Sequence, residues 1–244
     1  MSIIPDSIPN ALTSPGFFTA FEPSRMVVEN SALALATPLL VRQQRTSQGH
    51  PILMVTGALS TNIGTNQMRR VLTRIGHHPH TPPNTTMFHK PMRILEIVQE
   101  ETEKLYEQYR EPITLAGWCM GGVFTRMTAQ AMPDKVRQVI NMGTARTAVW
   151  YPKDLGAAAE PLPVPSTVIY SRTDGMTMRA HVCEPEGPQV ENIEVLSSHW
   201  GMANHPHTLH IVANRLAQPL GEWTPYPGLR GAQDETSPET AAAA

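Results

Sequence analysis

The chain has 244 residues, of which 41% are hydrophobic and 16% are charged, and its formal net charge at pH 7 is −2. A chain of this length and apolar content can bury one substantial hydrophobic core, so we expect a single globular domain. The small net charge and the lack of a Lys- or Arg-rich run argue against binding to nucleic acid or to an anionic membrane. We therefore expect a soluble protein with a small-molecule substrate.

The two ends of the chain differ in composition from its middle. Residues 1–36 are rich in Pro, Ser and Asn and lack a charged leader or a long apolar run, which predicts an N-terminal extension that wraps the surface or is partly mobile. Residues 37–229 form the predicted domain, and residues 230–244 form a predicted disordered tail. No stretch approaches a membrane span. Cys119 and Cys183 are expected to be free thiols, so we predict a cytoplasmic protein.

Between these ends, apolar runs and amphipathic periods alternate along the chain. In chain order they predict a strand at Leu39–Val41, a strand at Ile52–Val55, a helix at Asn66–Ile75, a loop at His77–Thr86, a long helix with an apolar face from Ile94 to Tyr109, a strand at Ile113–Ala116, a helix at Val123–Met132, strands at Val136–Asn141, Ser166–Ser171 and Ile193–Ser197, and a helix at His205–Ala217. Strands that alternate with helices are typical of an α/β fold, in which a mostly parallel sheet is covered by helices on both faces.

The most informative motif is Gly117-Trp118-Cys119-Met120-Gly121-Gly122. It has the G-x-nucleophile-x-G form of a nucleophile elbow, with cysteine at the centre, and it lies between a predicted strand and a predicted helix. In such an elbow the strand turns so sharply into the helix that the central side chain is strained and exposed. We therefore predict that Cys119 is a catalytic nucleophile. The alternative is a small buried cysteine at a strand-helix junction.

A nucleophile at an elbow needs a histidine base and a carboxylate that orients the base, and in chain order these follow as acid and then histidine. Asp174 follows the predicted strand Ser166–Ser171, and His199 follows the predicted strand Ile193–Ser197. Both side chains should lie at the carboxyl edge of the sheet, where open α/β sheets bind ligands. The alternatives are a turn aspartate and a loop histidine. The predicted catalytic residues are Cys119, His199 and Asp174.

From about Leu39 to Pro227, the chain resembles the α/β-hydrolase superfamily, and within it small bacterial α/β-fold hydrolases. The matching segments are residues 49–57, the elbow, residues 136–143, residues 169–175 and residues 197–199. The G-x-C-x-G-G elbow is also locally similar to those of polyhydroxyalkanoate synthases and dienelactone hydrolases. The resemblance implies an α/β-hydrolase fold with a short lid within Ala145–Val164. It also implies an oxyanion hole formed by the backbone N–H groups of Met120 and Ala58, with Leu59 as the less favoured second donor.

A cysteine nucleophile forms a thioester with the acyl group of its substrate, and thiolates leave tetrahedral intermediates readily. We therefore expect an ester, a lactone or a thioester as substrate, with acyl-CoA and acyl-carrier protein among the candidate thioesters, and water as the final acceptor. The alternatives are a thioester-dependent acyltransferase or cyclase, and a catalytically silent binding protein with the same fold. The oligomeric state is left open.

Two groups of histidines invite a metal-site hypothesis. They are His77, His78 and His80, and His205, His207 and His210. Neither group is accompanied by a carboxylate or a cysteine at a recognised metal-binding spacing, so we predict no metal and no other cofactor. Five methionines lie near the proposed site, where they could line an apolar acyl pocket or fill the core. They are Met120, Met142, Met176, Met178 and Met202.

Overall fold

The computed structural model describes residues 18–44, 46, 48–57, 62–83, 90–146 and 158–229. Its centre is a six-stranded, all-parallel sheet with the strand order β2-β1-β3-β4-β5-β6. The strands are β1 (Pro51–Val55), β2 (His78–His80), β3 (Ile113–Trp118), β4 (Val136–Met142), β5 (Ser166–Tyr170) and β6 (Val190–Glu194). The α-helices are α2 (Glu22–Gln44), α3 (Asn66–Ile75), α4 (Pro91–Tyr109), α5 (Gly121–Ala131), α6 (Arg179–Val182) and α7 (Pro206–Ala217). Short 3₁₀ turns lie at Asn62–Thr65, Pro133–Lys135 and Met202–Asn204.

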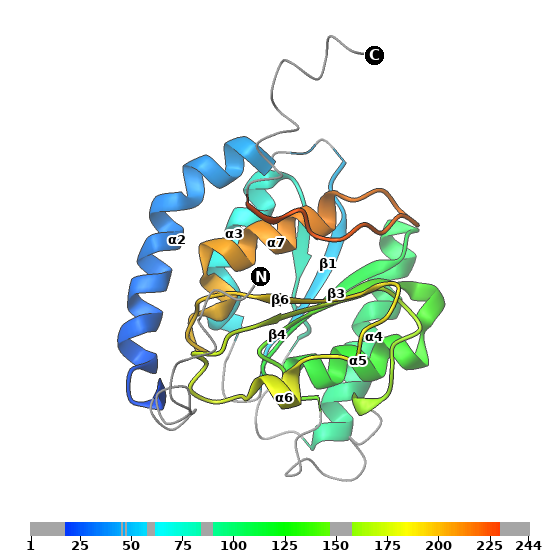
Figure 1. Cartoon of the computed structure of the whole chain (residues 1–244). Coiled ribbons are helices and arrows are strands. Elements are labelled where there is room, and N and C mark those ends of the chain that lie inside the picture. The colour runs from blue at the N-terminus through cyan, green and yellow to red at the C-terminus, as the bar shows by residue number, and fades with distance from the viewer. Residues whose placement is uncertain are drawn as a thin grey trace.

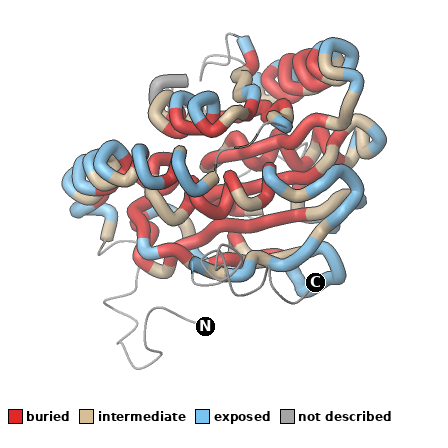
Figure 2. Tube along the Cα trace, turned by 90° about the horizontal axis from the view of Figure 1, so that it is seen from above, coloured by how far each residue is buried: buried red, intermediate tan, exposed pale blue. Residues whose placement is uncertain are grey.

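The central strands are buried on both faces because helices cover the sheet on both sides (Figure 1). Alternate residues of β1 point to opposite faces, so Ile52 and Met54 join one hydrophobic cluster while Leu53 and Val55 join another. Figure 2 shows the burial along the backbone, with buried strands inside the molecule and exposed helix turns outside. Burial on both faces explains why the sequences of the central strands are nearly continuous apolar runs.

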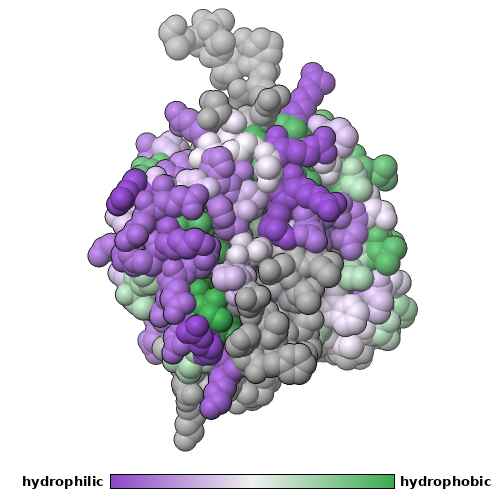
Figure 3. All heavy atoms as spheres, turned by 180° about the vertical axis from the view of Figure 1, so that it is seen from behind, coloured by the Kyte–Doolittle hydropathy of each residue, from purple (hydrophilic) through white to green (hydrophobic). Residues whose placement is uncertain are grey.

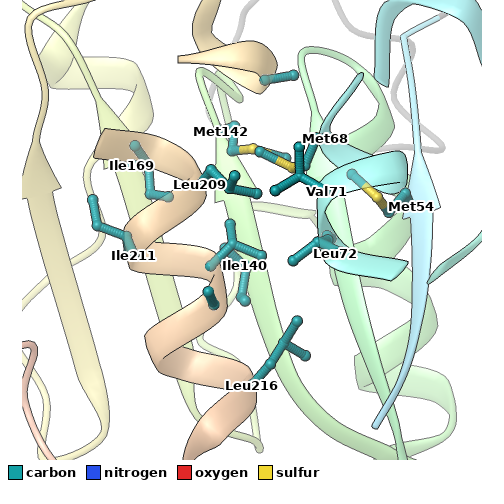
Figure 4. Close-up of a cluster of buried hydrophobic side chains, with 14 of the residues drawn as sticks. Met54, Met68, Val71, Leu72, Ile140, Met142, Ile169, Leu209, Ile211 and Leu216 are labelled. Carbon is teal, nitrogen blue, oxygen red and sulfur yellow. The ribbon is translucent and has the colours of Figure 1, made fainter. Parts of the chain in front are cut away.

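The first cluster lies between the sheet and the helices α2, α3 and α7. In Figure 4, Met68 and Leu72 of α3 and Leu209 of α7 point toward Ile140 and Met142 of β4. The second cluster lies between the opposite face and the helices α4 and α5. Together the two clusters hold the sheet rigidly, so the loops that leave its carboxyl edge start from fixed positions.

The predicted α/β fold is confirmed, as are the helices α3, α4, α5 and α7 and the strands β1, β3, β4 and β5. The strand predicted at Leu39–Val41 is wrong, because these residues lie in the 23-residue helix α2, which also crosses the predicted domain boundary at residue 36. The loop predicted at His77–Thr86 contains the short strand β2. The last strand ends at Glu194, earlier than predicted, and the segment that contains His199 is irregular.

Several other expectations concern segments of special composition. Both cysteines are free thiols in the structure. Most of the predicted lid and the whole predicted tail, residues 147–157 and 230–244, lie outside the described residues. Within the part of the chain that the structure describes, no helix is long and apolar enough to cross a membrane.

Candidate active site

Cys119 occupies a sharp turn between the end of β3 and the start of α5. Its backbone φ is +56°, a left-handed value that L-residues rarely adopt, and it costs about 1–2 kcal/mol. The turn is held by hydrogen bonds from Cys119 N to the Met142 carbonyl (3.0 Å) and from Gly122 N to the Cys119 carbonyl (3.2 Å). A Cβ at Gly121 would lie 2.0 Å from the Val55 carbonyl oxygen, so only glycine fits there. The local geometry is that of the predicted elbow.

Asp174 and His199 lie next to each other at the carboxyl edge of the sheet. Asp174 Oδ2 lies 2.8 Å from His199 Nδ1, and both side chains are almost fully buried. Asp174 Oδ1 accepts hydrogen bonds from the backbone N–H groups of Met176 and Thr177, both at 2.7 Å, and Oδ2 accepts one from the Thr177 hydroxyl at 2.8 Å. The carboxylate is therefore fixed in one orientation and holds the Nδ1 proton of the imidazole.

The second nitrogen of His199 faces the elbow. Nε2 is buried and makes no hydrogen bond of ordinary length and angle with the described residues. Burial alone lowers the pKa of His199, but the hydrogen bond with Asp174 and the interactions with the nearby Cys119 sulfur and the Asp174 charge raise it to about 10. The indole of Trp118 donates to the His199 carbonyl at 3.0 Å and so fixes the base from its backbone side. The structure thus brings together all three predicted catalytic side chains.

The predicted oxyanion hole is described only in part. Met120 begins the turn into α5, and its backbone N–H lies beside Gly57, where a built Cβ would be 3.4 Å from Met120 N and 3.3 Å from Cys119 Sγ. The chain after β1 therefore passes directly over the nucleophile. Ala58 and Leu59, the predicted second donors, lie outside the described residues.

Cys119, Met120 and His199 open into a cavity of about 1070 Å³. Its walls come from two helices and from aromatic side chains near the site. They include Met26, Asn30 and Ala34 of α2, Asn66, Gln67 and Arg70 of α3, and Trp118 and Trp200. A space of this size, mostly apolar with a few polar groups, is typical of a small-molecule binding site.

The five methionines considered as pocket residues divide between two roles. Met120 and Met176 line the cavity. Met142 and Met202 are buried in the hydrophobic cluster beneath α3 and α7, and Met178 is exposed. Two of the five methionines therefore line the cavity, and two others fill the core.

The histidine groups are engaged in other contacts. His80 Nε2 lies 2.8 Å from the Tyr109 hydroxyl, and His210 Nδ1 lies 2.8 Å from the Tyr226 hydroxyl. Burial lowers the pKa values of His77 and His205 to about 4, which keeps both rings neutral at physiological pH. No group of three or more His, Cys, Asp or Glu residues among the described residues could hold a metal ion.

The structure also reveals polar residues of α2 at the site that the sequence analysis missed. The Glu22 carboxylate accepts hydrogen bonds from the backbone N–H groups of Gly175, His199 and Trp200 at 2.8–3.0 Å. Glu29 accepts one from Ser198 N at 2.7 Å. A weak signal existed in the sequence, because Glu22 and Glu29 are seven residues apart on the helix face that continues to Leu33 and Leu40.

Comparison with known proteins places the fold. No protein-family model and no curated protein matches this chain. Among similar solved structures, lipase B of Aspergillus fumigatus has a TM-score of 0.61 at 14% identity, over 72% of this chain and 54% of that chain. A monoacylglycerol lipase of Paleococcus ferrophilus has a TM-score of 0.53 at 13% identity, over 68% of this chain and 96% of that chain. The match covers little more than half of the Aspergillus lipase.

A third similar structure is a thioesterase domain, NocB, solved as a covalent complex with a fluorophosphonate analogue of nocardicin G. Its TM-score is 0.50 at 16% identity, over 71% of this chain and 96% of that chain. These similar structures are two lipases and a thioesterase domain, and each of them aligns with about 70% of this chain. The present chain has the α/β-hydrolase fold.

Proposed function

We propose that this protein is an acyl-processing hydrolase that forms a covalent acyl-cysteine intermediate at Cys119. The observation that carries the proposal is the buried hydrogen bond of 2.8 Å between Asp174 and His199. The imidazole of His199 lies beside the thiol of Cys119, which occupies a strained elbow. His199 serves as the base and Asp174 orients it. The backbone N–H groups of Met120 and Ala58 stabilise the oxyanion.

The reaction begins when the Cys119 thiol gives its proton to Nε2 of His199, and the raised pKa of His199 favours this transfer. The Cys119 sulfur attacks the substrate carbonyl carbon, and the carbonyl oxygen takes up the negative charge. When this intermediate collapses, the leaving group departs with the proton from His199, and a thioester remains. Neutral His199 then removes a proton from water, which attacks the thioester and releases the acid. The Cys119 sulfur is the leaving group of this second step.

The substrate class follows from the leaving groups that a thiolate can displace. A thioester releases a thiolate, which is a leaving group equivalent to the Cys119 sulfur. The oxygen leaving group of an activated ester or a lactone departs with proton donation from His199, whereas an unactivated amide is harder to cleave. The cavity of about 1070 Å³ has room for a long or branched acyl chain. Carriers such as acyl-CoA or acyl-carrier protein are therefore compatible donors.

The cysteine also favours a second candidate, acyl transfer or cyclisation. A thioester intermediate reacts well with amines and thiols, so an acceptor that enters the cavity could compete with water. A catalytically silent binding protein is the third possibility.

Partition of the acyl group tests these candidates. The protein is incubated with an activated ester, with and without alcohol, amine and thiol acceptors, and the free acid and the transferred product are quantified. A hydrolase releases free acid at a rate that no acceptor changes. A transferase forms transferred product at the expense of acid and is slow with water alone. A silent protein does neither, and Cys119→Ala provides the background rate.

A further inference from the structure

The first half of helix α2 has its polar face inside and its apolar face outside. Its only buried residues before Leu33 are Glu22 and Glu29, whereas Val27 is 60% exposed and Val28 is 66% exposed. In Figure 3, hydrophobic surface gathers along the edge of the molecule where α2 runs. Burying two glutamates while exposing apolar side chains is unfavourable unless the carboxylates find specific partners. The hydrogen-bond partners of Glu22 and Glu29 therefore indicate the role of the first half of α2.

The partners of Glu22 lie on both catalytic loops. Oε1 accepts hydrogen bonds from Gly175 N at 2.8 Å and from His199 N at 3.0 Å, and Oε2 accepts one from Trp200 N at 2.9 Å. Gly175 directly follows Asp174. A single carboxylate thus links the backbone of the acid loop to the backbone of the histidine loop.

Arg25 and Glu29 extend the same contact. The Arg25 guanidinium donates to the carbonyl and, at 2.7 Å, to the hydroxyl of Thr173, the residue before Asp174. Glu29 accepts from the backbone N–H of Ser198, the residue before His199, at 2.7 Å and from its hydroxyl. Three side chains of one helix face therefore hold the residues on either side of both members of the pair.

We propose that Glu22, Arg25 and Glu29 are positioning residues that align Asp174 and His199 with Cys119, so that the first half of α2 belongs to the active site. The inference rests on the proposed acyl chemistry for its turnover readout. It predicts that the imidazole loses its alignment with the sulfur when a carboxylate is removed, even though none of the three residues touches the cavity next to Cys119. A misalignment of about 1 Å lowers a catalytic rate by about a hundredfold.

The test compares Glu22→Gln with Glu107→Gln, a matched change on the exposed surface of α4. Turnover of an activated ester, alkylation of Cys119 by iodoacetamide between pH 5 and 10, and thermal unfolding are measured, all in a Cys183→Ala background. For Glu22→Gln we expect kcat to fall tenfold to a hundredfold with KM within about twofold of the parent. We also expect slower alkylation with an altered pH profile. Glu107→Gln should match the parent in all three measurements.

Three results would overturn the proposal. The first is a kcat for Glu22→Gln within twofold of the parent. The second is a loss of kcat that disappears once the measured turnover rate is divided by the fraction of folded protein. If Glu22→Gln unfolds, the same measurements are made on Glu22→Asp, which keeps the negative charge. The third is an unchanged pH profile of alkylation. If the parent itself turns over no ester, the proposed function fails, but alkylation of Cys119 still tests the alignment.

A different observation supports a second inference, which concerns the substrate. The described residues that line the cavity include no Asp or Glu. Besides His199, the basic residue among them is Arg70 of α3. Arg70 is exposed and has no hydrogen bond or ion pair with the described residues, whereas its neighbour Arg69 donates to Asn66. Asn30 of α2 adds an amide to the same wall.

We infer that Arg70 binds an anionic group, a carboxylate or a phosphate, at the end of the acyl substrate remote from the reacting carbonyl. A guanidinium binds such groups with two parallel hydrogen bonds, and the lack of a carboxylate in the wall leaves its charge available. This inference also rests on the proposed function, and it narrows the substrate to acyl compounds with a negative charge.

Two aryl esters of equal chain length provide the test, one ending in a carboxylate and one in its methyl ester. We expect Arg70→Gln to raise KM for the charged ester about tenfold more than it raises KM for the neutral ester. Arg74→Gln, one turn further along α3 and outside the cavity, is the control. Equal KM values for the two esters in the native protein, or an equal effect of Arg70→Gln on both, would overturn the inference while leaving the hydrolase proposal intact. Turnover of neither ester would contradict the hydrolase proposal instead.

Discussion

Gly143 packs against the Asp174–His199 pair. Its replacement by alanine should lower activity by more than its effect on stability explains. Gly143 follows β4, has a φ of +57°, and is held by a hydrogen bond from its N–H to the Ile169 carbonyl at 2.9 Å. A Cβ at this position would lie 3.2 Å from both Asp174 Oδ2 and His199 Nδ1. These distances are shorter than ordinary van der Waals contact, so the pair would have to move by a few tenths of an ångström.

The expected magnitude has two parts. An alanine in the left-handed region costs about 1–2 kcal/mol of folding free energy at any position. Displacement of the pair adds a catalytic loss of about tenfold in kcat, less than the hundredfold associated with a shift of about 1 Å. Gly221→Ala is the matched control, because Gly221 has a φ of +84° and a Cβ there would meet nothing within 4 Å.

Both variants are assayed by denaturant unfolding and by turnover of an activated ester. Gly143→Ala and Gly221→Ala should lose similar stability, and only Gly143→Ala should lose kcat. If the two variants retain the same kcat, the close packing of residue 143 against the pair has no catalytic consequence.

Three further predictions concern other groups of the structure. Burial raises the pKa of the Cys183 thiol, so iodoacetamide at pH 7 should alkylate Cys119 much faster than Cys183, and peptide mapping with equal rates would contradict this. Burial lowers the pKa of His77 to about 4 from 6.5, so the unfolded chain binds a proton that the folded one does not. Stability should therefore fall by about 3 kcal/mol between pH 6.5 and pH 4, and the fall should be smaller in His77→Asn. Arg126 and Glu184 form a buried ion pair, so Glu184→Leu alone should cost about 3–5 kcal/mol in chemical unfolding. The double variant with Arg126→Met should recover much of that loss, and no recovery would argue against the pair.

Elements whose inward face is apolar were predictable from the sequence. The helix α3 has its buried residues at Met68, Val71, Leu72 and Ile75, the spacing of one helical face, and its predicted bounds agree with the structure. The helix α2 is an exception. In its first half the buried residues are glutamates, and Val27 and Val28 are exposed. Hydrophobic periodicity is therefore uninformative over that half.

Edge strands were harder to predict than central ones. The strand β2 has the sequence His-Pro-His at the edge of the sheet, where proline is tolerated because the free side needs no donor. At the opposite edge, β6 carries polar residues and only Ile193 is buried, so its position along the chain was misjudged by three residues at its start.

The site divides in the same way into local and long-range parts. Cys119, Asp174 and His199 each follow a strand, and a local motif or strand end identifies them. Glu22 and Glu29 meet the histidine loop across more than 160 residues of sequence, through hydrogen bonds to backbone groups. A contact with backbone leaves no residue-type signal at the partner position, so the tertiary structure was needed to find it.

An acyl group on Cys119 adds its own mass to the protein, so the mass of the intact protein tests the covalent intermediate. The native protein is incubated with an activated ester or an acyl thioester, quenched in acid, and measured together with Cys119→Ala and His199→Ala. We predict a single acyl adduct that maps to Cys119, forms slowly in His199→Ala, and is lost in Cys119→Ala. An adduct of equal extent in Cys119→Ala, or hydrolysis of the ester by that variant at the native rate, would contradict the account.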